Sequence, residues 1–369
     1  MNSKPKIAII GLKGLPALGG AASSSELVIE ELKEYYDFFI YSVDSHTEKK
    51  GFWNGYTQIV FKRSKIKYIN ILIYYIKSVL HCLIFGKYDI IHVNHLSFGL
   101  FVPFLKIRYK VIGTDRGLSW MYQTGKGNKW NKYELCFIRI SKYFFIKFVD
   151  ILVTVSSEYL PYYKKYKENV TVINNGIRIQ PITTSEKNKK NYLLFSAGRI
   201  IELKGCHLFL EALHKLNYSK KVLIIGNINH SQDYKKRIIN LAKGLNVEFI
   251  DLIKEKTLLS NIINKAKIFI FPSLSEGMSN MLLEVANQKT PLIVSNIPEN
   301  TSVFSEDEVL FFNSNDVDDL AKKIKYALEN YNLMLEKAEK AYQKLASDYN
   351  ITIISKQYEK QYNKLIGII

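Results

Sequence analysis

Short apolar runs that alternate with helix-forming stretches are the feature of this sequence that most restricts its fold. Runs of this length, bounded by polar or glycine-rich segments, are typical of buried strands in a parallel sheet. Six such runs precede residue 174, at residues 6–11, 38–41, 90–94, 110–113, 151–155 and 170–173. Six more follow residue 191, at residues 192–197, 222–226, 247–252, 268–272, 291–295 and 309–312. We therefore expect an α/β chain with two successive doubly wound parallel sheets.

A polar segment separates the two sets of runs. Residues 183–191 have low apolar content and no periodicity, so we interpret them as an interdomain linker. The length of 369 residues also fits two domains. We expect a first domain at residues 1–182 and a second at 183–349, with a C-terminal helix at about 350–369 that crosses back to the first domain.

Positive charge is concentrated in the first half of the chain. The whole sequence has 52 Lys and Arg against 34 Asp and Glu, a net charge of +18. Residues 61–148 contain 16 Lys and Arg but only three acids, Asp89, Asp115 and Glu134, which makes +13 of that total. A localised field of this kind attracts an anionic partner, such as nucleic acid, a lipid head group or a phosphorylated substrate.

Composition excludes two classes of protein. The 47% apolar and 13% aromatic content excludes intrinsic disorder. Three widely separated cysteines, Cys82, Cys136 and Cys206, exclude a disulfide scaffold and favour a reducing compartment. The first six residues lead directly into a strand-like run, so we expect no secretory signal and a cytoplasmic protein.

Two helices can be placed with some detail. A helix is expected at residues 23–32, with Ser23 and Glu26 as its capping box. The apolar stretch 66–85 carries Lys67, Asn70, Lys77 and His81 at helical spacing, which is too polar for a spanning helix of about 20 apolar residues. We expect an amphipathic helix with a narrow polar stripe, either buried in its domain or with one edge against lipid.

Two groups of residues in the second half point to chemistry. In the first, Gly198 and Arg199 follow a strand and precede Lys204 and Gly205 at the start of a helix. Backbone amides at such a junction, with two basic side chains, suit a diphosphate. An exposed Arg and Lys beside a turn would give the same pattern.

In the second group, a polar loop with Glu276 follows a strand, a helix begins near Ser279, and Glu284 lies further along it. Carboxylates are acceptor-only partners for vicinal hydroxyls, so two of them suit a sugar and a ribose. A capped helix with one exposed and one core-edge glutamate is the alternative.

Together these segments resemble the family 4 retaining glycosyltransferases. Residues 198–205 are similar to that family's Gly-Arg-x4-Lys-Gly signature, and Glu276 with Glu284 matches its Glu-x7-Glu motif. Residues 172–177 are similar to its Val-Ile-Pro-Asn-Gly-Ile hinge, with Asn174 where proline is usual. Residues 11–32 look most like the rhamnosyltransferase-type branch of bacterial surface-polysaccharide enzymes. The resemblance implies the GT-B fold, two Rossmann-like domains that face a cleft containing the active site.

The resemblance also implies roles for individual residues. Arg199, Lys204 and Glu276 would be catalytic: the two cations would bind the donor diphosphate and stabilise it as it departs, and Glu276 would hold the donor sugar. Glu284 would accept hydrogen bonds from the ribose. The remaining donor-binding residues would be Gly20, Arg116, Gly198, Gly277, Met278, Ser279 and Asn280.

The first domain departs from the family pattern at two further positions. Arg116 occupies the place of the histidine in a Thr-x-His-Gly motif, and Asn94 replaces the second histidine of an Asp-x-x-His-x-His run. Arginine does not act as a base at neutral pH, but it neutralises a phosphate or an acidic sugar. We interpret His92 as a hydrogen-bonded histidine at a strand end and assign no role to His95.

The implied function is metal-independent transfer of a hexose, with retention of configuration, from a nucleotide diphosphate-sugar to an acceptor hydroxyl. Asp316 and Asp318 match the Asp-x-Asp pattern of some metal sites, but they lie at the start of an expected helix, and we expect them to cap it. A UDP-sugar is the favoured co-substrate and no cofactor is expected. The acceptor would be a glycan linked to a polyprenyl diphosphate, and the basic half would hold the protein to the inner face of an anionic membrane.

Three alternatives remain at this stage. A nucleotide-sugar hydrolase or an epimerase would share the fold and the donor contacts. A nucleic-acid-binding protein would explain the charge, but the basic region lacks a recognisable nucleic-acid-binding motif, so we expect no nucleic-acid partner.

Overall fold

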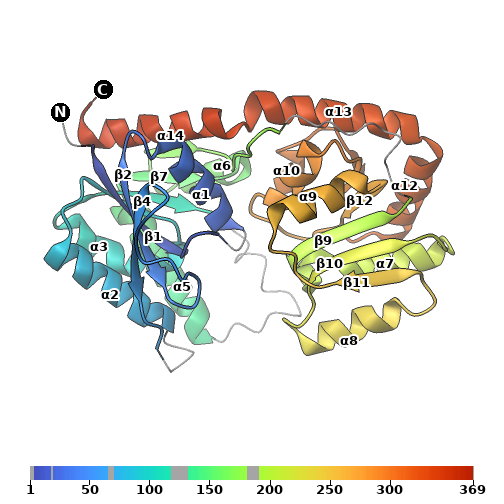
Figure 1. Cartoon of the computed structure of the whole chain (residues 1–369), viewed down its shortest axis with the longest axis horizontal. Coiled ribbons are helices and arrows are strands. Elements are labelled where there is room, and N and C mark those ends of the chain that lie inside the picture. The colour runs from blue at the N-terminus through green and yellow to red at the C-terminus, as the bar shows by residue number, and fades with distance from the viewer. Residues whose placement is uncertain (1–3, 18–19, 65–69, 118–131, 181–190, 369) are drawn as a thin grey trace. The chain divides into compact units, whose positions relative to one another are not determined.

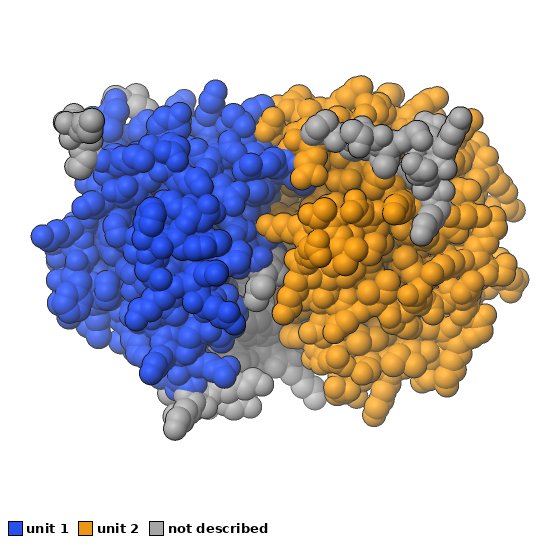
Figure 2. Space-filling view, viewed as in Figure 1, with its two compact units in different colours: residues 1–178, 351–369 blue, residues 179–350 orange. Residues whose placement is uncertain are grey.

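The computed structural model describes residues 4–17, 20–64, 70–117, 132–180 and 191–368. The chain forms two compact units, shown in Figures 1 and 2: unit 1 comprises Met1–Arg178 with Ile351–Ile369, and unit 2 comprises Ile179–Asn350. The units divide after Arg178, slightly before the boundary expected at 182/183. Apart from Asn191, the expected linker at 183–191 lies outside the described residues.

Unit 1 is built on an eight-stranded sheet in the order β3-β4-β2-β1-β5-β6-β7-β8. All neighbouring strands are parallel except β3 and β4, which form an antiparallel hairpin. The strands are β1 (Lys6–Lys13), β2 (Asp37–Val43), β3 (Gly51–Trp53), β4 (Tyr56–Phe61), β5 (Ile90–Val93), β6 (Lys110–Asp115), β7 (Ile151–Thr154) and β8 (Val170–Val172). The six strands expected in this half are confirmed.

The β3–β4 hairpin was not predicted. Asn54 and Gly55 both have positive φ, 50° and 86°, the conformation of a tight hairpin turn. An Asn-Gly pair between apolar residues is a strong hairpin signal, so the sequence did contain the information.

Alternate residues of β1 face opposite sides of the sheet, and each side has its own core. Ile7 and Ile9 pack with α1 and α14, whereas Ala8 and Ile10 pack with the layer that contains α2, α3 and α5. Burial on both faces explains why these strands are continuous apolar runs. The helices of unit 1 are α1 (Ala21–Leu32), α2 (Asn70–Phe85), η2 (Leu96–Phe101), α3 (Val102–Lys106), α5 (Lys132–Phe148), η3 (Ser157–Tyr159), α6 (Leu160–Lys164) and α14 (Ile351–Ile366).

Two details of these helices correct the sequence analysis. Helix α1 starts at Ala21 with Gly20 as its N-cap, so Ser23 lies inside the helix and forms no capping box. The carboxylate of Glu26 instead accepts a hydrogen bond from the backbone N–H of Ala17, at 3.2 Å. The polar stripe expected on α2 is incomplete: Lys77 is exposed, but His81 bonds the Tyr41 hydroxyl at 3.0 Å, and the other exposed residues of the helix are apolar. Lys67 lies outside the described residues.

Unit 2 contains a six-stranded parallel sheet in the order β11-β10-β9-β12-β13-β14. Its strands are β9 (Leu193–Arg199), β10 (Val222–Asn227), β11 (Val247–Ile250), β12 (Ile268–Phe271), β13 (Leu292–Ser295) and β14 (Leu310–Phe312), all at predicted positions. Its helices are η5 (Glu202–Lys204), α7 (Cys206–Lys215), α8 (Gln232–Leu241), α9 (Lys256–Lys265), α10 (Asn280–Asn287), α11 (Pro298–Thr301), α12 (Val317–Glu329) and α13 (Tyr331–Asp348).

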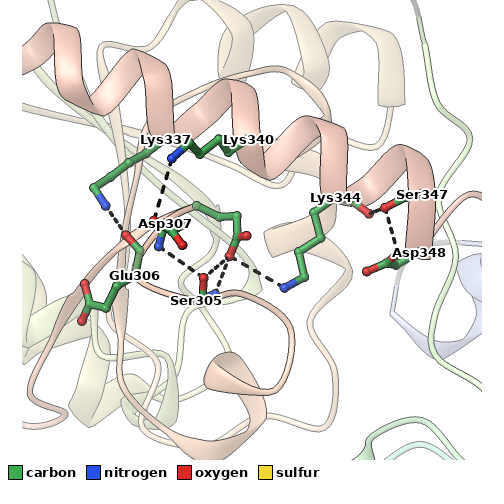
Figure 3. Close-up of polar contacts among 9 residues, drawn as sticks. Ser305, Glu306, Asp307, Lys337, Lys340, Lys344, Ser347 and Asp348 are labelled. Atoms are coloured by element: carbon green, nitrogen blue, oxygen red, sulfur yellow. Dashed lines mark hydrogen bonds and ion pairs between the residues drawn. The ribbon is translucent and has the colours of Figure 1, made fainter.

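Helix α13 is attached to unit 2 by a row of lysines, shown in Figure 3. Lys337 donates to the carbonyl of Glu306, Lys340 lies 3.8 Å from Asp307, and Lys344 lies 3.7 Å from Glu308. Exposed pairs contribute little each, but three on one helix face fix its orientation on the loop at 305–308.

Helix α14 belongs to unit 1, because it packs where the chain leaves that unit. The backbone N–H of Ile351 donates to the carbonyl of Ile177 at 2.9 Å, and Ile351 and Ile354 are both 1% exposed. A Cβ on Gly176 would lie 2.9 Å from Ile351 Cδ1 and 3.1 Å from Ile351 Cα. Glycine at this position therefore lets α14 approach the sheet.

We expect Gly176→Ala to lower the free energy of unfolding of unit 1 by about 1–3 kcal/mol, because α14 must shift to accept the methyl group. Urea unfolding measures this. Gly198→Ala is the matched control, since a Cβ at Gly198 meets no protein atom within 4 Å. Equal stability of the two variants would contradict the packing argument.

Candidate functional site

The predicted site residues of unit 2 lie around the switch point of its sheet. Strands β9 and β12 are neighbours, but β10 follows β9 on one side and β13 follows β12 on the other. Ligands of open α/β sheets bind outside the carboxyl ends of the strands at such a point. The segment 198–205 follows β9 and the segment 272–280 follows β12, so both predicted groups lie at this edge.

The two glycines of the first group have different structural roles. Gly205 has φ 69° and is the N-cap of α7, and a Cβ there would lie 1.9 Å from the carbonyl oxygen of Pro272. Gly198 has open space where its Cβ would be, and Arg199 beside it is exposed. Gly205 is therefore required by the fold, whereas Gly198 leaves room above the end of β9.

Lys204 and Glu276 form an ion pair, with Nζ 2.5 Å from Oε1. The Glu276 side chain is 8% exposed and that of Lys204 is 27% exposed. The backbone holds the pair in place, because Leu274 N–H donates to the Leu203 carbonyl at 2.8 Å. The sequence placed these two residues in separate groups and did not predict that they touch.

The loop and helix after Pro272 bring further polar groups to the same edge. Ser275 is 7% exposed, and its hydroxyl has no hydrogen-bond partner among the residues that the structure describes. Ser279 is the N-cap of α10 but its side chain makes no capping hydrogen bond. Gly277, Met278 and Asn280 lie in the same segment at the start of α10, where the first backbone N–H groups of a helix have no partner within the helix itself.

Glu284 lies one turn into α10, and the pKa of its carboxyl group is raised. Burial raises its pKa from 4.5 to about 7, although Lys256 opposes the shift. Between these two values the folded state holds a proton that the unfolded state has lost. Folding stability therefore falls as the pH rises from about 4.5 to about 7.

We expect Glu284→Gln to remove this dependence, because an amide carries no charge to desolvate. The melting temperature of the variant minus that of the unchanged protein should become more positive as the pH increases from 5 to 8. Differential scanning calorimetry at several pH values in this range measures the difference. A constant difference across that range would show that burial does not control the Glu284 carboxyl group.

Unit 1 has an equivalent switch point between β1 and β5. Gly20, which follows β1, has φ 59° and open space at its Cβ position, so the backbone here is accessible at the start of α1. Asn94 follows β5, and Arg116 follows β6, the next strand of the sheet.

Arg116 is held by neutral groups. Its guanidinium donates to Asn175 Oδ1 at 2.8 Å, to Ser25 Oγ at 2.6 Å and to Asn94 Oδ1 at 2.9 Å. Its Nε is buried, and no acceptor for it lies among the described residues. Arg116 and Asn94, which both depart from the family pattern, are thus in direct contact.

The carboxyl group of the neighbouring Asp115 bonds groups other than the Arg116 guanidinium. Asp115 accepts a hydrogen bond from the Tyr163 hydroxyl, and burial raises its pKa to about 6. The charge of Arg116 is also felt by His92, whose pKa is lowered to about 3, first by burial and then by Arg116. An arginine held by neutral acceptors retains its full attraction for an anion.

The interpretation of His92 is confirmed. Its Nδ1 bonds the Tyr362 hydroxyl and its Nε2 bonds Thr114 Oγ1, both at 2.8 Å, so it connects β5 to α14 and β6. His95 caps η2 through a hydrogen bond from the Ser97 N–H at 3.3 Å.

Asp316 is a helix cap, as expected, since its carboxylate accepts from the Asp319 N–H at 2.9 Å. Over the described ranges, no three His, Cys, Asp or Glu side chains gather as metal ligands would. Within those same ranges, none of the helices combines the length and the apolarity needed to cross a bilayer.

Comparison with known proteins shows which family the second half of the chain is similar to. Residues 181–344 match the family model of glycosyl transferases group 1. The capsular polysaccharide biosynthesis glycosyltransferase CapH of Staphylococcus aureus is 31% identical over 146 residues, which cover 38% of this chain and 39% of CapH. The O-antigen biosynthesis glycosyltransferase WclY of Escherichia coli is 26% identical over 304 residues, 76% of this chain and 80% of WclY.

Among solved structures, Anabaena Alr3699/HepE in complex with UDP and glucose superimposes with a TM-score of 0.78 at 16% identity, covering 98% of this chain and all of HepE. Likeness at this identity shows the fold. Residues 181–344 therefore match the glycosyl transferases group 1 family model, in a chain that has the two Rossmann-like domains of the GT-B fold.

Proposed function

We propose that this chain transfers a hexose from a nucleotide diphosphate-sugar to an acceptor hydroxyl, with retention of anomeric configuration and without a metal ion. The observation that carries the proposal is the Lys204–Glu276 ion pair beside the exposed Arg199, at the switch point of a group 1 domain. The pair brings a cation and a hydroxyl acceptor to one place, which is what a sugar diphosphate requires.

Arg199 and Lys204 would bind the diphosphate. When the bond between the anomeric carbon and the phosphate oxygen breaks, the electron pair leaves with the diphosphate, and the two cations stabilise that growing charge. The acceptor oxygen bonds to the same face of the anomeric carbon, and its proton passes to the departing diphosphate. No protein nucleophile takes part in this route, and the two side chains supply the positive charge that a metal provides elsewhere.

The carboxylates would hold hydroxyl groups. Glu276 has two carboxylate oxygens, and we propose that it binds the sugar together with backbone groups of residues 277–280. Glu284 would accept from the ribose hydroxyls. Because hydrogen bonds donated to a carboxylate favour its charged form, nucleotide binding would release the proton that burial retains on Glu284.

The relatives suggest the donor and the pathway. HepE has been solved with UDP and with UDP-glucose, which supports a UDP-sugar. CapH and WclY are named for capsule and O-antigen synthesis, which supports a surface polysaccharide and an acceptor glycan on a polyprenyl diphosphate. Such acceptors place the reaction at the cytoplasmic face of the cell membrane. Arg116 would neutralise a phosphate of the donor.

The test begins with a thermal-shift comparison of UDP, GDP and dTDP on the full chain, followed by incubation of the sugar form of the best ligand with lipid-linked glycan acceptors in EDTA. We expect UDP to stabilise most, and the new glycosidic linkage to show the donor's anomeric coupling constant by NMR. Inversion of that coupling would refute retention, loss of turnover in EDTA would refute metal independence, and free sugar alone would show a hydrolase.

A further inference from the structure

Helix α2 presents an apolar face to solvent. Leu72, Ile76, Leu80 and Ile84 recur every fourth residue and are all exposed, Ile84 by 64%. The opposite face, with Tyr74, Tyr75, Val79 and Cys82, is buried in the core of unit 1. A helix that needed only to cover its sheet would carry polar residues on the outer side.

The neighbouring helix α3 extends this apolar surface. Figure 1 shows α2 and α3 side by side within unit 1. Arg108, just beyond α3, donates from Nη1 to the carbonyl of Leu83 near the end of α2, at 2.9 Å. Ile107, which precedes Arg108 in the chain, is 80% exposed, and Ile84 follows Leu83. Phe104, one turn earlier on α3, is also exposed.

Basic residues surround the apolar face. Lys77 lies near the middle of α2 and donates to the backbone carbonyl of Lys62 at 3.3 Å, so the chain at Lys62 passes close to this helix. Lys62, Arg63, Lys77, Lys87, Arg108 and Lys110 are exposed. From Lys62 to Thr114 the sequence has nine Lys and Arg and one acid, Asp89, whose carboxylate accepts from the Lys6 backbone at 2.7 Å.

We propose that this face of unit 1, formed by α2 and α3, docks on an anionic lipid bilayer. Exposed Ile and Phe side chains enter the boundary between head groups and acyl chains, and the surrounding lysines and arginines contact lipid phosphates. The 16 residues of α2 span about 24 Å, too short to cross a bilayer, so the helix lies in the interface.

Charge selects the lipid surface over other occupants. A second copy of the chain would bring two cationic rims together, which is repulsive, and nucleic acid would leave the apolar stripe in water. An anionic membrane satisfies both the apolar side chains and the cations. The inference does not depend on sugar transfer, because it concerns a surface outside the candidate site.

Vesicle flotation of the full chain tests the proposal, with vesicles of phosphatidylcholine alone or mixed with phosphatidylglycerol. We expect binding to the mixed vesicles, weakened but not abolished by salt, and about tenfold weaker or more for Ile84→Glu/Ile107→Glu. The matched control is Ile239→Glu/Leu258→Glu, which changes two similarly apolar exposed positions on helices of unit 2 and should bind like the unchanged chain.

A second variant separates the charge from the apolar contact. Lys62→Gln/Lys77→Gln should reduce binding to the phosphatidylglycerol vesicles and leave the small binding to phosphatidylcholine alone unchanged. Absence of vesicle binding by the unchanged chain, or equal binding by the Ile84→Glu/Ile107→Glu variant, would overturn the proposal. So would a dimer in sedimentation analysis that this variant dissociates. Binding without any sugar transfer would refute only the proposed function.

Discussion

The Lys204→Ala variant is expected to lose sugar transfer almost completely, with kcat/KM reduced about a thousandfold. Arg199→Ala should reduce kcat/KM by a similar factor. Both cations are assigned to the charge that develops on the departing diphosphate, an interaction that is stronger in the transition state than in the bound substrate. The decrease should therefore appear mainly in kcat, with a smaller rise in KM for the donor. Steady-state kinetics with the nucleotide sugar identified by thermal shift measures both quantities.

Lys204→Ala also leaves the buried Glu276 carboxylate without this cation, so stability must be measured beside activity. Lys221→Ala is the matched control, because Lys221 forms an ion pair of 2.7 Å with Glu248 on the surface of the same unit. Arg237→Ala, which removes pairs with Glu202 and Glu211, is the control for Arg199→Ala. Turnover within tenfold of the unchanged enzyme in both Lys204→Ala and Arg199→Ala would contradict the mechanism.

A comparison with Glu276→Gln separates the two roles of the ion pair. If Lys204 acts on the diphosphate, Glu276→Gln leaves that cation in place and should retain more activity than Lys204→Ala. If the pair serves only to fix the loop after Pro272, both variants should lose stability and activity together. The double variant completes the cycle and gives the coupling between the two side chains directly.

The positions of the strands along the chain, and the strand ends that carry the two motifs, could be predicted from sequence because both are local properties. An apolar run such as that of β12 is recognisable by itself, and its polar continuation marks a carboxyl end. In a parallel sheet these ends share one edge, so residues after β9 and β12 meet without any knowledge of side chains. The sequence placed Arg199 and Lys204 at the end of one strand and Glu276 after another, and the structure shows that these two strands, β9 and β12, are neighbours.

Side-chain contacts between segments that are distant in the sequence could not be predicted in this way. Lys204 and Glu276 are 72 residues apart, and their pairing depends on the close approach of Gly205 to Pro272. The contact between Asn94 and Arg116 could not be predicted either, because one sequence does not show two positions changing together. The structure explains this pair physically: the arginine requires acceptors, and Asn94 supplies one.

The buried face of α2 illustrates a different limit. Its Leu, Ile and Tyr residues occupy both the buried and the exposed face, so periodicity alone does not show which apolar face is buried. The choice depends on partners for hydroxyl groups: Tyr74 donates to the Tyr41 carbonyl at 2.9 Å, and Tyr75 bonds Ser97 Oγ at 2.6 Å. Tyrosines with such partners are buried, and the leucines and isoleucines are left outside.

The second large effect is expected at Gly198 and Gly205, two glycines of one motif with opposite behaviour. Gly205→Ala places a methyl group 1.9 Å from the Pro272 carbonyl oxygen at a residue with φ 69°, so the loop that carries Glu276 must move. We expect the free energy of unfolding to fall by about 2–4 kcal/mol, with loss of most turnover. Urea denaturation and the transfer assay measure the two effects.

Gly198→Val should leave stability unchanged, because its side chain enters open space at a strand end where a β-branched residue is favourable. If that space receives the donor, the variant should lose at least about a hundredfold in kcat/KM by excluding the diphosphate from the carboxyl end of β9. Gly198→Ala, with a smaller side chain, should lie between Gly198→Val and the unchanged enzyme. A fully active Gly198→Val variant would show that the donor does not approach β9, and the assignment of Arg199 would then fail with it.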